Sequence, residues 1–409
     1  MTTPARDVMP SAAPAPAAAP RRFFGLHPAI PLMASTHFVV DAYGNIYAPL
    51  LPLLIPALGM SLTMAGTLAM CFQLASSVSQ LGFGAIADRW RPRRLVIAGP
   101  LLAVVVLSAI GWASSPLTLG LILILGGFGG AMFHPPAAAL VHAISDHRKG
   151  FSMSVHITGG SLGFSIAPLV FAPMIAAVGL GWSPVIAIPG LVALAYTLRR
   201  VPPIEPPPRG SAGGFRGLRP YARPLTLLYF VVVLRTLTGA GLATFMPVLL
   251  TRQGMGVGEA SAAVSLYLFL SGIGGFLGGP LADRFGPRRV IIWSLVSAVP
   301  FLVAGPLMTG WTLTLLLAVG GFLLQSTLPV NVTFGQALAP VSAATVSSLM
   351  MGFAWGTGGL MVPIVGLVAD RAGLPLALSL VGLVPLGAAA FALPLPAVAP
   401  SLPDRVTAP

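Results

Sequence analysis

Twelve apolar segments of about 20–30 residues follow one another along this chain, separated by short breaks. Each is long enough to cross a hydrocarbon layer about 30 Å thick as an α-helix, which rises about 1.5 Å per residue. Only 8% of the 409 residues are charged and 56% are hydrophobic, whereas soluble proteins have about 25% charged residues. The sequence therefore predicts an all-α membrane protein with twelve transmembrane helices. Alternating strand patterns are absent, so a transmembrane barrel is not supported.

The predicted spans form two groups of six on either side of a proline-rich linker. They are expected at residues 28–57, 61–86, 94–113, 116–145, 149–178 and 181–199, and then at 221–252, 258–282, 288–309, 311–338, 342–369 and 374–397. The resulting division is a disordered cytoplasmic N-tail (1–25), an N-terminal six-helix bundle (26–199), a cytoplasmic linker (200–220), a C-terminal six-helix bundle (221–397) and a C-tail (398–409).

The basic residues gather on one side of this predicted topology. Of 22 Lys and Arg, 19 lie in the two tails, the linker and the breaks after spans 2, 4 and 8. Only Arg252 and Arg371 fall on the other side, and Arg235 lies within span 7. This bias predicts a multi-pass protein of a bacterial-type inner membrane with both termini in the cytoplasm. The net charge of +13 thus reports orientation, and we expect no nucleic-acid partner.

The two groups of spans match each other at a constant offset of 195 residues. The stretch from Gly84 to Arg94 recurs from Gly279 to Arg289. The pairs Pro52 and Pro247, Gly59 and Gly254, Gly163 and Gly358, and Pro168 and Pro363 keep the same register. Because three separated regions share one offset, the chain is predicted to be an internal duplication. Two parallel six-helix repeats are the plan of a rocker-type transporter with its site at the midplane between the halves.

The duplicated Gly-x-x-x-Asp-Arg-x-x-x-Arg-Arg motif predicts a conformational latch. Its glycine permits close helix approach, and its aspartate suits an arginine or a helix N-terminus. Two positive-inside loops alone explain the arginines but not the glycine, the aspartate or the repetition. The predicted latch residues are Gly84, Asp88, Arg89 and Arg93, and Gly279, Asp283, Arg284 and Arg288.

With this motif present twice, the chain resembles the major facilitator superfamily. The first copy has Arg91 where the signature usually has glycine, and the second has Gly286. Within the superfamily it is similar to the fosmidomycin-resistance proteins, on the stretches His37–Asp41, Phe72–Ser77, Phe133–Pro135, Phe353–Gly359 and Gly366–Asp370. The resemblance implies export of a drug-like phosphonate or other toxic anion, and a monomer.

Ionisable groups at mid-membrane cost about 2.5–3.5 kcal/mol on insertion scales and mark function by default. Asp41 is the acidic residue placed well inside a helix, and His37 lies one turn earlier on the same face. Arg235 aligns with Val40 in the other repeat. We therefore expect an Asp41–Arg235 ion pair between the halves, with Asp41, Arg235 and His37 serving proton coupling. The alternative is a static salt bridge that fixes the packing of the two helices.

Further polar and aromatic residues within the spans are expected to line a substrate cavity. Helix packing is the alternative role for each of them. The predicted substrate-binding residues are Asn45, Tyr43, Gln73, His134, His156, Tyr267, Gln325, Asn331 and Trp355.

These features predict a secondary active transporter that exports a small anionic or amphipathic compound by proton-coupled alternating access. A proton-coupled importer of an organic anion or metabolite is the alternative, because direction cannot be read from sequence. A membrane-embedded enzyme is disfavoured, since the local cluster His134, His142, Asp146 and His147 spans too much of one helix for a single site. No phosphate-binding loop for a nucleotide-driven pump is present. A single cysteine and scattered methionines predict no metal site, and no cofactor is expected.

Overall fold

The computed structural model describes residues 26–87, 92–145, 149–201, 215–339 and 343–397. Within these residues, twelve helical spans are long and apolar enough to cross a membrane, which confirms the predicted all-α class and span count. The spans are Ala29–Leu58, Leu62–Gly84, Pro92–Trp112, Pro116–Ile144, Phe151–Val178, Leu180–Thr197, Leu218–Arg252, Val257–Phe285, Pro287–Leu307, Gly310–Leu338, Thr345–Ala372 and Leu374–Ala392.

Several spans are built from two consecutive helices. The first half contains α1 (Ala29–Gly44), α2 (Tyr47–Leu58), α3 (Leu62–Ser77), α4 (Ser79–Ala87), α5 (Pro92–Ser108), α6 (Pro116–Ile144), α7 (Lys149–Val178) and α8 (Ala187–Leu198), with 3₁₀ segments η1 (Ala109–Trp112) and η2 (Leu180–Ile186). The second half contains η3 (Phe215–Tyr221), α9 (Ala222–Arg252), α10 (Val257–Phe285), α11 (Pro287–Ala304), η4 (Gly305–Leu307), α12 (Gly310–Gln325), α13 (Thr327–Leu338), α14 (Ala343–Ser347), the π-helical η6 (Ser348–Phe353), α15 (Ala354–Gly359), α16 (Val362–Ala372) and α17 (Leu374–Ala392).

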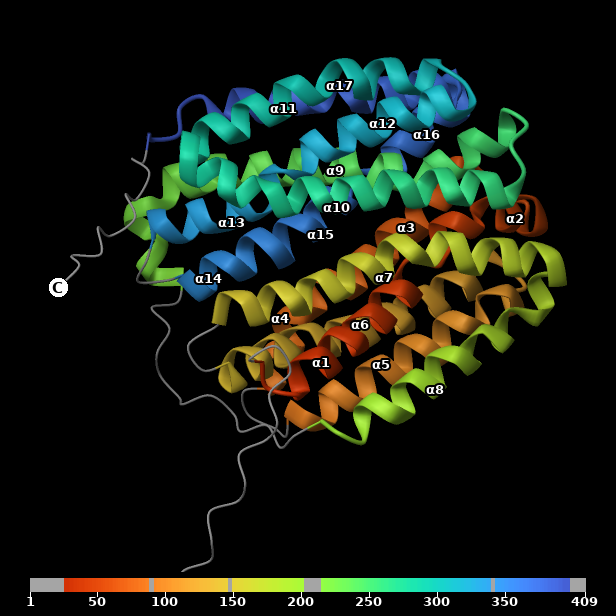
Figure 1. Ribbon diagram of the computed structural model, residues 1–409. Helices are drawn as coiled ribbons and strands as arrows, with labels where there is room; N and C mark the ends of the chain where they lie inside the picture. The colour runs from red at the N-terminus through yellow and green to blue at the C-terminus, as the bar shows by residue number, and fades with distance from the viewer. Residues whose placement is uncertain (1–25, 88–91, 146–148, 202–214, 340–342, 398–409) are drawn as a thin grey trace, which may run out of the picture.

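The helices form two bundles side by side, α1–α8 in the lower part of Figure 1 and α9–α17 in the upper part. We call the end where the first span starts and the last span stops the proximal end. The opposite end, where α2 meets α3, is the distal end (right in Figure 1). Pairs of helices that join the bundles include α3 with α16 and α7 with α10.

The first distal turn of each repeat begins at a glycine. Gly59 and Gly254 end the first span of each half with φ angles of 59° and 96°, a region that L side chains rarely adopt. Ser61 then starts α3 by accepting a hydrogen bond from the Met64 backbone N–H at 3.1 Å. Such a serine cap satisfies one of the free donors at a helix N-terminus.

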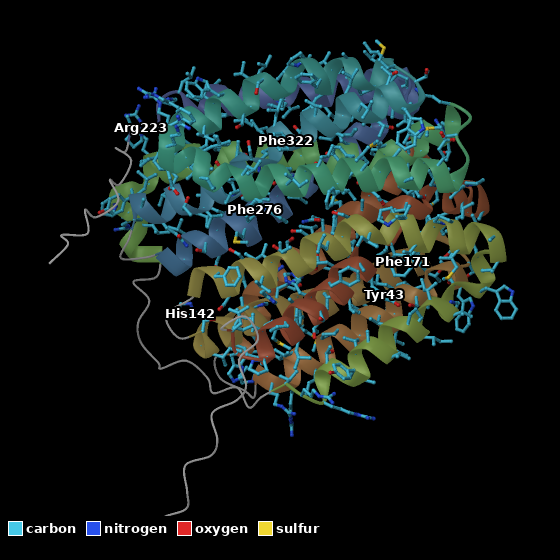
Figure 2. The ribbon with its side chains drawn as sticks, in the orientation of Figure 1. Tyr43, His142, Phe171, Arg223, Phe276 and Phe322 are labelled. Carbon is cyan, nitrogen blue, oxygen red and sulfur yellow. The ribbon has the colours of Figure 1, made fainter. Side chains whose placement is uncertain are left out.

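Close glycine packing fixes α1 against α7 inside the first bundle. A Cβ at Gly159 would overlap the backbone of Ala34, and one at Gly163 would overlap the backbone of Phe38. Farther along, the rings of Tyr43 and Phe171 lie 4.9 Å apart (Figure 2). Small residues let helices approach closely in a membrane, where packing drives association. The α1–α7 contact places residues of α7 opposite the polar face of α1.

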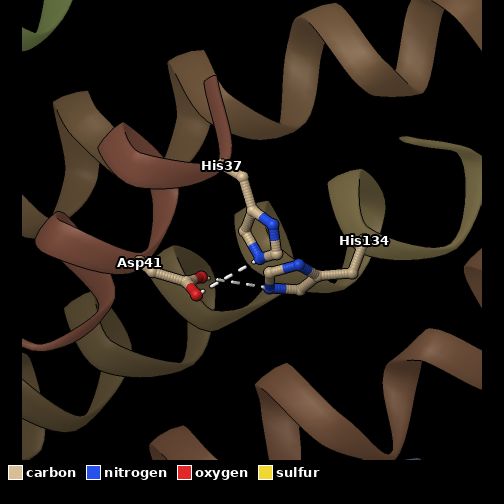
Figure 3. A group of neighbouring side chains, drawn as sticks. All are labelled: His37, Asp41 and His134. Atoms are coloured by element: carbon tan, nitrogen blue, oxygen red, sulfur yellow. Dashed lines mark ion pairs between the residues drawn. The ribbon is translucent and has the colours of Figure 1, made fainter. Parts of the chain in front are cut away.

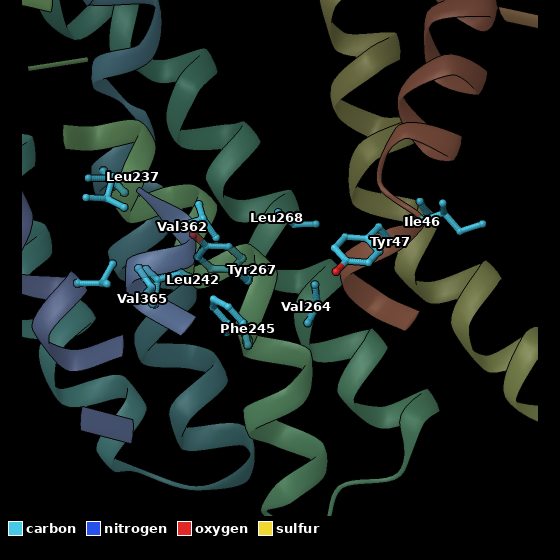
Figure 4. Packing of buried hydrophobic residues seen from close by; sticks show 14 of the residues in the cluster. Ile46, Tyr47, Leu237, Leu242, Phe245, Val264, Tyr267, Leu268, Val362 and Val365 are labelled. Carbon is cyan, nitrogen blue, oxygen red and sulfur yellow. The ribbon is translucent and has the colours of Figure 1, made fainter. Parts of the chain in front are cut away.

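Between the bundles lies an apolar layer. Tyr47 of α2 lies beside Val264 and Leu268 of α10, and Phe245 of α9 packs deeper in the second half (Figure 4). All four side chains are buried, and the Tyr47 hydroxyl donates to the Ala65 carbonyl at 2.8 Å. The two halves therefore meet on a hydrophobic surface, in which polar contacts stand out.

Candidate functional site

A carboxylate and three imidazoles meet inside the first bundle. His37 and Asp41 lie one turn apart on α1, with His37 Nε2 and Asp41 Oδ2 separated by 3.2 Å. His134 of α6 brings its Nε2 to 3.5 Å from Asp41 Oδ1 (Figure 3). His156 of α7 lies with its ring centroid 4.4 Å from that of His37. Three helices thus converge on Asp41, and we call these four residues the Asp41 cluster.

The hydrogen bonds of His37 determine how many protons it shares with Asp41. Its Nδ1 lies 2.9 Å from the His156 carbonyl oxygen, which can only accept, so Nδ1 carries a proton. A hydrogen bond between Nε2 and the Asp41 carboxyl then needs one more proton, held either by the imidazole or by the acid. The pair is therefore a site for one proton that two groups share.

The Asp41 cluster is partly exposed. The side chains of Asp41 and His134 are 24% and 27% exposed, whereas that of His37 is 11% exposed. His156 is 2% exposed, and its Nδ1 has no hydrogen-bond partner. The cluster thus has an accessible side at Asp41 and His134 and a buried side at His156.

Gly160 of α7 leaves the space that the pair occupies. A Cβ there would lie 2.5 Å from both Asp41 Oδ2 and His37 Nε2, which is too close for any real contact. Gly160 is not among the site residues predicted from the sequence. Its signal was the small-residue spacing of Gly159, Gly160 and Gly163 in one span.

Three members of the Asp41 cluster also offer atoms that could hold a cation. One ligand atom from each of His37, Asp41 and His134 lies within 4.8 Å of the others, the one such trio in the described parts of the chain. The separations of 3.2 and 3.5 Å are those of hydrogen bonds and ion pairs.

The second bundle contains a buried cation instead. Arg235 of α9 is 2% exposed. One terminal nitrogen donates to Gln325 Oε1, and the other donates to Thr236 Oγ1 at 3.2 Å. The guanidinium carbon lies 5.7 Å from the ring centre of Trp355. Arg235 Nε has no partner, and none of the described acidic residues forms an ion pair with Arg235. A buried charge without a counter-ion is costly.

The expected ion pair between Asp41 and Arg235 does not form in this structure. Asp41 pairs with histidines of its own bundle, and Arg235 bonds to Gln325 and Thr236 of its own bundle. The face of α1 that carries Asp41 packs against α6 and α7, and these helices supply closer partners than α9 does. The equivalence of Val40 and Arg235 places them at the same depth but not in contact.

The remaining predicted substrate-binding residues divide into three groups. Tyr43 and Asn45 join helices: the Tyr43 hydroxyl donates to the Ile186 carbonyl, and Asn45 Nδ2 donates to the Phe164 carbonyl at 2.8 Å. Gln73 lies between the halves, because a Cβ at Gly359 would meet its side chain. Tyr267 and Asn331 are each 1% exposed, and both polar atoms of the Asn331 side chain lack partners.

The predicted latch residues are placed only in part. Asp88 and Arg89 lie outside the described residues. Arg93 Nε donates to the Val201 carbonyl at 3.1 Å, and Arg288 donates to the Leu393 carbonyl. Each of these arginines therefore binds the end of the last span in its own half. Asp283 and Arg284 are exposed, and a Cβ at Gly279 would meet nothing within 4 Å.

The family model described as Major Facilitator Superfamily matches residues 33–256 and 228–408. The chain belongs to the major facilitator superfamily. This confirms the resemblance read from the duplicated motif, and with it a membrane transporter rather than an enzyme. As a superfamily member with twelve apolar spans, it is a multi-pass inner-membrane protein that moves a small-molecule substrate.

Individual relatives agree along nearly the whole chain. The fosmidomycin resistance protein of Escherichia coli (strain K12) is 28% identical over 90% of this chain and 91% of its own length. An uncharacterized MFS-type transporter, YfnC of Bacillus subtilis (strain 168), is 26% identical over 90% and 93%. A bacterial homolog of the human lysosomal transporter Spinster, in an inward-facing and unoccupied conformation, superposes with a TM-score of 0.75 at 19% identity, over 89% and 95% of the two chains. That likeness shows the fold.

Proposed function

We propose that this superfamily member is a proton-coupled exporter of a small anionic or amphipathic compound. Substrate binds between the two halves, which rock to expose the site to either side of the membrane in turn. The Asp41 cluster exchanges the proton and Arg235 attracts the anion. The chain works as a monomer, with its proximal end and both termini in the cytoplasm.

The observation that carries this proposal is the shared proton of His37 and Asp41. Because Nδ1 is tied to the His156 carbonyl, the pair gains or loses one proton at the Asp41 side. The titratable groups that face it from the packed helices are His134 of α6 and His156 of α7. Separation in an apolar site favours the neutral acid and contact with an imidazolium favours the carboxylate, so proton occupancy can follow conformation.

The unpaired Arg235 supports an anionic substrate. A guanidinium is always charged and can hold a carboxylate, phosphonate or sulfonate through two parallel hydrogen bonds. Trp355 beside it supplies an apolar wall for an amphipathic compound. The fosmidomycin resistance relative supports export of drug-like compounds, and the sequence bias that assigns 19 basic residues to one side of the predicted topology supports the orientation.

Flux in proteoliposomes tests the proposal. Purified full-length protein is reconstituted with an internal pH dye, and fosmidomycin and a panel of phosphonates, carboxylates and sulfonates are offered as probes. We expect a substrate gradient to move protons in the wild type. Asp41→Asn keeps the shape but cannot release a proton, so substrate-driven proton flux should fall to the level of empty liposomes.

Glu259→Gln is the matched control, because it also removes one carboxylate but at the exposed distal surface. It should leave proton flux unchanged. Wild-type proton flux in Asp41→Asn would overturn the coupling role. Accumulation in cells gives the direction: an exporter lowers the internal probe concentration, and a raised concentration would establish the importer.

A further inference from the structure

One carboxylate of the second half binds the first half at the distal end. Asp370 lies near the end of α16, and α3 begins opposite it. Asp370 Oδ1 accepts from the Leu62 backbone N–H at 2.9 Å, and Oδ2 accepts from the Thr63 backbone N–H at 2.8 Å. The Thr63 hydroxyl donates to Oδ2 at 2.6 Å. Three hydrogen bonds thus link residues that lie more than 300 positions apart in sequence.

These bonds use the free donors of a helix N-terminus. The first backbone N–H groups of α3 have no partner within the helix, and its dipole favours a negative charge there. Ser61 satisfies the N–H of Met64, and Asp370 satisfies those of Leu62 and Thr63. Hydrogen bonds to a charged acceptor are about twice as strong as neutral ones. The first half therefore depends on the second to complete this helix end.

Two glycines bring the helices close enough for this contact. A Cβ at Gly66 of α3 would lie 2.9 Å from the Val362 carbonyl oxygen. A Cβ at Gly366 of α16 would overlap the backbone of Leu62. The two helices therefore touch backbone to backbone, with Asp370 one turn beyond Gly366. We call this contact the α3–α16 seam.

The other seam between the halves lacks this polar contact. In the repeat, Asp370 corresponds to Ile175 of α7, and Leu62 and Thr63 correspond to Val257 and Gly258 of α10. A Cβ at Gly258 would lie 4.0 Å from the Pro173 side chain, an ordinary apolar contact. The carboxylate is therefore a feature of one seam and not a requirement of the duplicated fold.

We propose that Asp370 is the distal gate latch of the transport cycle, holding the halves together at this end and releasing α3 when the site opens there. This rests on the proposed alternating access, because a rocking motion that opens the distal end must break all three bonds. Such a latch favours the state with a closed distal end over the state with an open distal end. Its removal shifts the balance between the two states without disturbing the packing inside either bundle.

Distance measurements between spin labels test the latch in the full-length protein. With Cys71→Ala as background, labels are placed through Ser114→Cys and Thr309→Cys, at exposed positions in distal turns of the first and second halves. A closed distal end gives one short distance. Removing the charged acceptor by Asp370→Ala should raise the long-distance population on the order of tenfold, because bonds to charged groups contribute enough to change an equilibrium by that factor.

Two further variants serve as a milder form of the test and as its control. Thr63→Val removes only the hydroxyl donor and keeps both backbone N–H groups, so it should give a smaller increase and is the fallback where Asp370→Ala does not fold. Glu259→Ala is the control, because Glu259 accepts from Trp311 of its own half at the same end, at 3.1 Å. It should leave the distances unchanged.

The proposal that Asp370 is a distal gate latch is overturned if Asp370→Ala and Thr63→Val give the same distances as Glu259→Ala. It is also overturned where all three variants shift alike. Failure of the proposed function is a separate result, read from wild-type proton flux in liposomes. If the wild type transports and Asp370→Ala leaves the distances unchanged, the proposed function stands and the latch proposal fails.

Discussion

The two halves share one helical plan but differ in the chemistry at its centre. The first half brings together four titratable side chains, those of Asp41, His37, His134 and His156, whereas the second has Arg235, whose charge is permanent. The repeat positions of these four residues are Thr236, Val232, Pro329 and Met351, none of which titrates. Duplication has therefore kept the scaffold and divided the polar roles between its copies.

One pair of equivalent positions shows how small the structural change is. Gly160 of α7 corresponds to Trp355 of α15. The glycine leaves room for the His37–Asp41 pair. The tryptophan fills the matching place and lies beside the Arg235 guanidinium. The same position thus determines which polar group each half can hold.

The largest expected effect comes from removing the fixed charge of the second half. Arg235→Gln should weaken binding of an anionic probe by about 30-fold or more, since losing a buried charge contact costs about 2 kcal/mol or more. The thermal stability of the empty protein should not fall, because no acidic partner is left unpaired. Arg371→Gln, at an exposed distal site, is the control. Loss of stability with unchanged affinity would make Arg235 structural.

A medium effect should follow from closing the space in the first half. Gly160→Ala should lower the free energy of unfolding by about 1–3 kcal/mol through overpacking, and should also reduce proton flux. Thermal unfolding in detergent and the dye assay measure the two. Gly82→Ala is the control, since a Cβ there meets nothing within 4 Å and alanine favours a helix. Wild-type stability and flux in Gly160→Ala would show that this space is not needed.

The smallest effect should be equal in the two halves. Arg93→Gln and Arg288→Gln each remove a bond to the end of the last span in their half, at a cost of about 0.5–1.5 kcal/mol. Thermal unfolding of both variants measures it. Unequal losses would mean that the scaffold has diverged as well. Reduced transport at unchanged stability would support the predicted latch role of these arginines.

The sequence was enough to predict the spans and the fold, because hydrocarbon thickness and a constant repeat offset both leave direct marks on it. It also singled out His37, Asp41, His134 and His156 but did not group the four. Depth along a helix follows from register, whereas the partner of a side chain depends on which helix packs against that face. For this reason the expected Asp41–Arg235 pair does not form in this structure, and the bonds of Asp370 to Leu62 and Thr63 were not foreseen.

The tether of His37 Nδ1 to a backbone carbonyl has a thermodynamic consequence. Under the proposed coupling, a pair that shares one proton carries one elementary charge with that proton in each cycle. Crossing a membrane potential yields about 2.3 kcal/mol per charge for each 100 mV, which corresponds to a concentration ratio of about fiftyfold. If the proposed coupling holds, this one hydrogen bond to the main chain limits what that proton draws from the membrane potential, and the charge of the compound and the pH difference add their own contributions.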